Sequence, residues 1–154
     1  MGKELEYHDS TLRYLKIKAL LSEAYLNQLE QKEIQFDIRL PAAFREWYSL
    51  EEHAKLLNSV PYQAQILSAT DWRIDKADPR NPMLIFWYEN QWTFALGIPL
   101  GDVDDPVVYK RANEPGEVWK PFVSCFSTFI YLIFKCPDET LAIRWDDDCY
   151  PLTA

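Results

Sequence analysis

The chain has 154 residues, the length of one ordinary domain, and can enclose a hydrophobic core without disulfides or a metal. Apolar residues make up 48% and charged residues 26%, a composition that excludes an intrinsically disordered chain. The net charge of −8 opposes binding to phosphate backbones and anionic lipid, and no apolar run approaches the roughly 20 residues that cross a bilayer. We therefore predict a protein that binds neither nucleic acid nor a membrane. The charged start of the sequence, which has no apolar stretch, predicts that the protein is cytoplasmic.

The residue types that usually carry catalysis or metal binding lack the required spacing. The three cysteines (Cys125, Cys136 and Cys149) form no C-x-x-C pair, and the two histidines (His8 and His53) have no Cys or His neighbour at the spacing of metal ligands. Four glycines cannot be arranged into either common nucleotide-binding loop. We predict no metal, no cofactor and no catalytic residue, and we expect that the protein is not an enzyme.

In chain order, the first predicted element is a long helix over residues 10–32, because apolar side chains recur there at intervals of three and four. A short helix is predicted over 41–48, with Pro41 at its first position, where a missing N–H costs nothing. Ser49-Leu50-Glu51-Glu52 fits a capping box and predicts a further turn or two of helix, carrying residues as far as Leu57.

The middle of the chain is predicted to form a sheet. Met83–Tyr88 and Trp92–Ile98 are apolar runs joined by the polar Glu89-Asn90-Gln91, which is typical of a hairpin. Shorter apolar or β-branched runs predict four further strands, at residues 63–67, 71–74, 107–110 and 118–120.

Helical spacing of apolar residues returns over residues 122–135. Helices, then a meandering sheet, then a helix predict a single α+β domain over residues 1–154. Its mostly antiparallel central sheet is flanked by the long N-terminal helix and the late C-terminal helix. The side chains on the apolar faces of the predicted helices should be buried, namely Phe44, Trp47, Phe126, Phe129 and Ile130.

Negative charge is concentrated in the second half, since residues 78–154 hold 12 acidic and 6 basic side chains. One cluster lies in the turn-rich segment Pro99–Pro106, here named the acidic loop, and another lies near the C-terminus. Loops and terminal segments commonly carry function. We predict that these clusters and the hairpin glutamate form a surface for a basic protein partner, comprising Glu89, Asp102, Asp104, Asp105, Asp146, Asp147 and Asp148. The alternative is that these acids only keep the protein soluble.

Five segments of the chain carry a common pattern, namely Leu40–Trp47, Trp87–Gln91, Gly97-Ile98, Asp104–Tyr109 and Phe126–Ile130. Together, and in matching order, they resemble the SUKH superfamily of Smi/Knr-like proteins. The first segment is similar to its early Leu-Pro helix and the last to its late Ser-Phe helix. The three between them are similar to the Glu-Asn-Gln hairpin, Gly-Ile strand end and Asp-Pro-Val-Tyr segment of one bacterial branch. The resemblance covers roughly residues 36–135.

This resemblance implies a SUKH-like fold and a binding function, with no cofactor and no catalytic residue. Members of the superfamily are mostly immunity proteins that neutralise a cognate toxin, often a nuclease or deaminase. The expected partner is therefore a basic toxin domain. Two alternatives stay open: a regulatory or assembly scaffold that binds the cell's own proteins, and a hydrolase that uses the aspartates of the acidic loop. The sequence makes no prediction of the oligomeric state.

Overall fold

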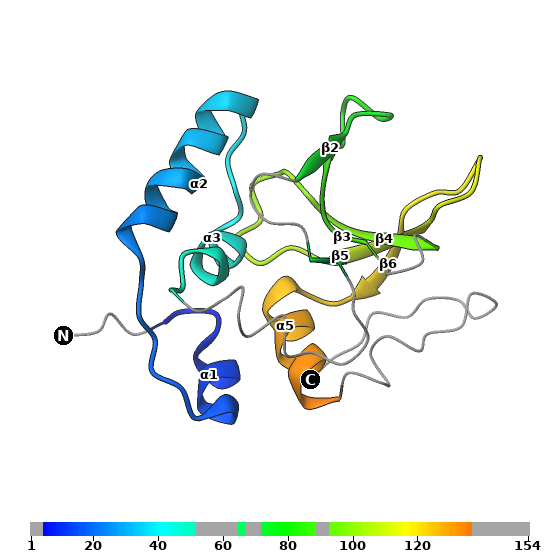
Figure 1. The fold of residues 1–154 in the computed structure, drawn as a ribbon. Helices are drawn as coiled ribbons and strands as arrows, with labels where there is room; N and C mark the ends of the chain where they lie inside the picture. Colours follow the sequence, from blue (N-terminus) through cyan, green and yellow to red (C-terminus); the bar gives the residue numbers. More distant parts are fainter. Residues whose placement is uncertain (1–4, 52–64, 67–71, 89–92, 137–154) are drawn as a thin grey trace.

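The computed structural model describes residues 5–51, 65–66, 72–88 and 93–136. In these residues, helices pack on an antiparallel sheet, which confirms the predicted α+β class (Figure 1). None of the helices among them is long and apolar enough to cross a membrane.

The N-terminal region holds two helices, α1 (Asp9–Leu15) and α2 (Glu23–Phe36), so the prediction of one continuous helix over residues 10–32 is wrong. Lys16 ends α1 in the left-handed conformation, with φ 57°. Its N–H and the following N–H bond back to carbonyls of the last turn, which closes the helix. The spacing of apolar residues predicts a helix on each side of this break, but it does not indicate the break itself.

The segment between α1 and α2 is extended because it pairs with the chain after the third helix. Leu21 and Leu50 form an antiparallel bridge, and the Ser22 N–H donates to the Ser49 carbonyl at 2.8 Å. The Ser22 hydroxyl then accepts the Tyr25 N–H at 3.2 Å and caps the start of α2. Long-range pairing here overrides the helical preference of the local sequence.

Helix α3 (Ala42–Tyr48) confirms the predicted short helix, with Pro41 immediately before its first residue. Ser49 follows as its C-terminal cap, and the Ser49 hydroxyl donates to the Glu46 carbonyl at 2.8 Å. The capping box predicted at Ser49 is therefore wrong, and Leu50, which we expected in a further helix, forms the bridge with Leu21. The rest of that predicted helix, beyond Glu51, lies outside the described residues.

The sheet has the strand order β1-β3-β4-β5-β6, with β2 also paired to β3, and every pairing is antiparallel. It confirms the predicted hairpin, as β3 and β4, and three of the predicted shorter strands, as β1, β2 and β5. The strands are β1 (Gln65–Ile66), β2 (Arg73–Asp75), β3 (Met83–Tyr88), β4 (Phe94–Pro99), β5 (Val108–Ala112) and β6 (Lys120–Val123).

The boundary between the last strand and the last helix differs from the prediction. We predicted a strand that stops before Pro121 and a helix that starts at Phe122, which is wrong, because α5 spans Phe126–Lys135. Pro121 lies inside β6, opposite Tyr109. Proline is tolerated in a strand at the end of the order, where not every N–H needs a ladder partner. Phe122 reaches the core from this strand.

The core lies between the sheet and the helices α3 and α5, with α2 packed on the outer side of α3 (Figure 1). Aromatic rings from both helices contact β3: the ring centroid of Phe86 lies 5.8 Å from that of Phe44 and 5.4 Å from that of Phe126. The predicted core is confirmed, because its five members are at most 2% exposed, namely Phe44, Trp47, Phe126, Phe129 and Ile130.

Candidate functional site

The acidic loop connects β4 to β5 and is held at the first turns of two helices. The Asp104 carbonyl accepts the Ala43 N–H of α3 at 2.8 Å. The Asp105 carboxylate accepts the Ser127 N–H of α5 at 3.0 Å and the Ser127 hydroxyl at 2.5 Å. Helices leave the N–H groups of their first turn unpaired, so both contacts satisfy donors that would otherwise lack a partner. The base of the loop is therefore fixed on the helical layer.

The outer part of the acidic loop remains exposed. Val103 is 59% exposed between two acidic neighbours, and Asp102 is also exposed. The Asp104 side chain is 58% exposed and lies 3.8 Å from the Arg39 guanidinium. The loop therefore presents an exposed apolar side chain with one carboxylate on each side of it.

The predicted binding residues thus have different surroundings. Asp102 and Asp104 face outward together, whereas Asp105 uses both carboxylate oxygens on Ser127 and has a structural role that the sequence did not indicate. The other predicted members, Glu89 and Asp146, Asp147 and Asp148, lie outside the described residues.

A second arrangement fixes the N-terminal segment on α3. The Glu46 carboxylate accepts the backbone N–H groups of Glu6, Tyr7 and His8 at 2.9, 3.0 and 2.9 Å. A carboxylate that accepts three backbone N–H groups has its hydrogen-bonding capacity largely used. Glu46 therefore sets the position at which the chain enters α1.

His8 is fully buried beside this anchor, against the rings of Trp47 and Phe126. Its Nε2 lies 2.7 Å from the Ala43 carbonyl, and since a carbonyl only accepts, Nε2 carries the proton. Burial lowers the pKa of His8, and the hydrogen bond to Ala43 and the nearby carboxylates of Glu46 and Asp105 only partly oppose that shift. The buried imidazole is therefore neutral at pH 7.

We expect His8 to make folding stability dependent on pH. The folded-state pKa is below the unfolded value of about 6.5, so the stabilisation is complete above that value and is lost as pH falls from it toward the folded pKa. Within that window the slope should approach about 1.4 kcal/mol per pH unit. Urea unfolding of the parent and of His8→Gln should show a flatter pH profile for the variant. Parallel profiles would contradict the assignment.

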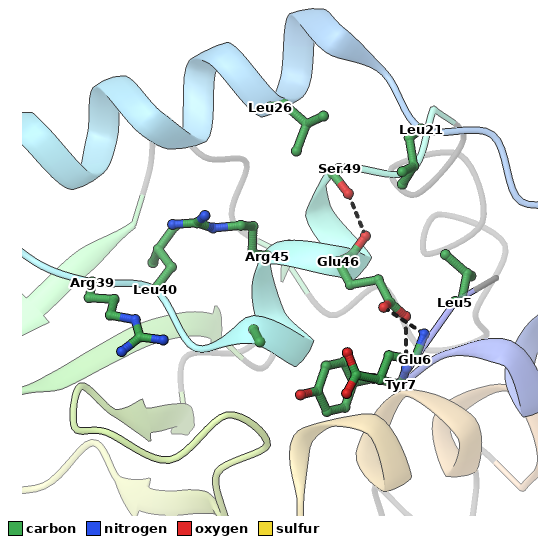
Figure 2. Close-up of a pocket in the computed structure, with 11 residues that line it drawn as sticks. Leu5, Glu6, Tyr7, Leu21, Leu26, Arg39, Leu40, Arg45, Glu46 and Ser49 are labelled. Atoms are coloured by element: carbon green, nitrogen blue, oxygen red, sulfur yellow. Dashed lines mark hydrogen bonds between the residues drawn. The ribbon is translucent and has the colours of Figure 1, made fainter. Parts of the chain in front are cut away.

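A pocket of about 260 Å³ opens between the N-terminal segment, α2 and α3. We name it the Tyr7 pocket (Figure 2). Apolar side chains from separate segments line it, namely Leu5, Leu21, Leu26 and Leu40. Figure 2 shows Arg39 at the opposite end of the pocket from Leu5 and Leu21. The lining of the pocket therefore combines apolar and charged side chains.

Two charged side chains of the Tyr7 pocket are engaged in structural contacts. Arg45 points toward α2 (Figure 2), where it pairs with Glu33, whose other oxygen accepts the Leu40 N–H at 2.9 Å. Glu46 points to the backbone of the N-terminal segment. Neither group is free to bind a further molecule without loss of these contacts.

The remaining charges make the surroundings of Tyr7 acidic. Glu6 is exposed and lines the pocket, and Asp104 adjoins it through its contact with Arg39. Burial, followed by the carboxylates of Glu6, Asp104, Asp105 and Glu46, raises the pKa of Tyr7. Four acids therefore act on this one phenol. Sequence reasoning missed Glu6, Tyr7 and Arg39, because nothing in their local pattern marks them.

Among the described residues, no group of three or more His, Cys, Asp or Glu side chains is arranged to hold a metal ion. Cys125 and Cys136 lie at the two ends of α5, and neither forms a disulfide within the described part of the chain.

Comparison with known proteins identifies no relative of this chain. The chain matches no family model, and no curated protein or solved structure resembles it significantly.

Proposed function

We propose that this chain is a non-catalytic protein-binding module of the cytoplasm, an immunity protein that neutralises a basic toxin domain such as a nuclease or deaminase. The resemblance of residues 36–135 to the SUKH superfamily motivates the proposal. The helix, sheet and helix order of the fold agrees with the α+β class that this resemblance implies.

The observation that carries the proposal is the exposed part of the acidic loop. Asp102, Val103 and the side chain of Asp104 face outward, while the Asp104 carbonyl and Asp105 fix the loop beneath them. A surface held in place before binding loses less conformational entropy when it associates. An apolar side chain between two carboxylates fits a partner that offers an apolar contact surrounded by basic residues.

The net charge of −8 supports a basic partner. Opposite net charges accelerate diffusional encounter, and this steering weakens as salt rises. Nucleases and deaminases act on polyanionic substrates, so their substrate-facing surfaces are commonly basic. An acidic protein that covers such a surface blocks access without any chemistry of its own.

We expect the double variant Asp102→Asn and Asp104→Asn to slow association with the toxin by a factor of about two to ten at low salt, with little change in the dissociation rate. Stopped-flow or biolayer measurements at several salt concentrations would test this, because the difference should shrink as salt is added. Folding stability should change little, since both carboxylates are exposed.

A matched control removes the same two charges elsewhere. Glu114 and Glu117 are exposed between β5 and β6, and their replacement by Gln should leave association nearly unchanged. Asp105→Asn should instead lower the free energy of unfolding by about 1–2 kcal/mol, because it weakens the contact with Ser127. Equal slowing by the control and the loop variant would show that only net charge matters.

The partner itself is identified by co-expression with the product of the adjacent reading frame. Rescue of a toxic product, with formation of a one-to-one complex, is the expected result. Recovery of several host proteins and no toxin would instead favour the regulatory scaffold. Turnover of substrates in a broad hydrolase screen, lost in the acidic loop variants, would favour an enzyme.

A further inference from the structure

The Tyr7 pocket has the size and lining of a site for one side chain. It has a volume of about 260 Å³, smaller than most small-molecule sites. Four leucines line it together with the charged Glu6 and Arg39 and the phenol of Tyr7. A long side chain with an apolar stem and a charged head matches this mixture of apolar and charged groups.

The charges decide which head the pocket favours. Arg45 is paired with Glu33, and Glu46 accepts three backbone N–H groups, so neither offers a free charge. What remains is Glu6, Asp104 and Arg39, in surroundings that already raise the pKa of Tyr7. A cation is favoured there, and the face of a tyrosine ring adds a cation–π contact.

Arg39 already places a guanidinium near one of these carboxylates. Its guanidinium is 3.8 Å from the Asp104 carboxylate, and its side chain is 73% exposed. An ion pair this long and this exposed contributes little to stability. The contact can therefore be replaced by another guanidinium at low cost.

We propose that the Tyr7 pocket receives an arginine side chain of the protein partner, with its stem against the leucines and its guanidinium at Glu6 and Asp104, in place of Arg39. This inference rests on the proposed function, because it assumes a basic protein partner. It extends the interaction surface from the acidic loop to the pocket beside it, through the contact of Asp104 with the pocket-lining Arg39.

The first experiment uses N-acetyl-argininamide, which presents one arginine side chain without terminal charges. Titrated into isotopically labelled protein, it should shift the amide signals of Tyr7, Ala42 and Ser49, which belong to pocket-lining residues. N-acetyl-leucinamide, the uncharged comparison, should bind more weakly. Equal shifts from the two probes, or no shifts at millimolar probe, would overturn the proposal.

Variants then test the charges at surface positions where folding is not at risk. Glu6→Gln and Asp104→Asn should each weaken arginine binding about twofold to fivefold, whereas Arg39→Gln should strengthen it by a similar factor. Glu114→Gln, an equal charge change between β5 and β6, should have no effect. If Glu114→Gln weakens binding as much as Glu6→Gln, the probe responds to net charge and the pocket is not its site.

The same variants separate this inference from the proposed function. If a toxin binds and is slowed by the acidic loop variant but is indifferent to Glu6→Gln and Arg39→Gln, the pocket inference fails and the immunity function stands. If the probe binds as expected and no toxin partner exists, the pocket binds a basic side chain and the immunity function fails.

Discussion

Truncation of Phe129 to alanine should lower the free energy of unfolding by about 3–5 kcal/mol. The ring is fully buried in α5, and its centroid lies 5.4 Å from Trp87, 5.8 Å from Phe86 and 6.4 Å from Phe122. Residues from strand and helix surround it, so the cavity that the truncation leaves cannot easily collapse. Urea unfolding followed by circular dichroism measures the loss.

Phe36 provides the matched control. It is the last residue of α2, is partly exposed, and the Lys32 ammonium lies over its ring, 5.6 Å from the centroid. Phe36→Ala removes the same group from the surface and should cost under about 1 kcal/mol. Similar losses at the two positions would mean that α5 does not pack on the sheet as described.

Replacement of Glu46 by alanine should lower the free energy of unfolding by about 2–4 kcal/mol. The change leaves three backbone N–H groups without their acceptor, those of Glu6, Tyr7 and His8, and the last two are partly buried with the carboxylate. It also loosens the entry to α1, so amide exchange at Tyr7 and His8 should accelerate more than exchange in β3 and β4.

A second substitution separates acceptor capacity from helix propensity. Glu46→Gln keeps one carbonyl oxygen and should recover part of the lost stability. Glu30→Ala, on the exposed face of α2, should change stability by less than about 0.5 kcal/mol. A Glu46→Ala protein as stable as Glu30→Ala would show that the N-terminal segment does not depend on this carboxylate.

The elements that could be predicted from the sequence are those whose signal is local. The hairpin of β3 and β4 and the apolar faces of α3 and α5 follow from the spacing of side chains. The break after α1 could not be predicted, because Lys16 is not a residue that usually adopts the left-handed conformation. The bridge between Leu21 and Leu50, which holds the extended segment, depends on where α3 lies.

The candidate site also has a part that the local sequence predicts and a part that it does not. The acidic loop is visible in the sequence as a cluster of aspartates between turn residues, but the distinction between exposed Asp104 and engaged Asp105 depends on Ser127, which is distant in sequence. The Tyr7 pocket has no local signal at all. Glu6 and Arg39 come to line one pocket only when the N-terminal segment docks on α3.

The contact between α1 and α5 has a consequence for the order of folding. His8 and Phe126, more than a hundred residues apart in the chain, have ring centroids 5.8 Å apart, and Tyr14 and Tyr131 are 5.9 Å apart. By contrast, the strands from β3 to β6 pair in the order of the sequence: β3 with β4, β4 with β5, and β5 with β6. Short loops close at lower entropic cost than long ones, so the meander forms early and the N-terminal helix docks late. Substitutions in α1 therefore act mainly on the rate of unfolding and leave the rate of folding nearly unchanged.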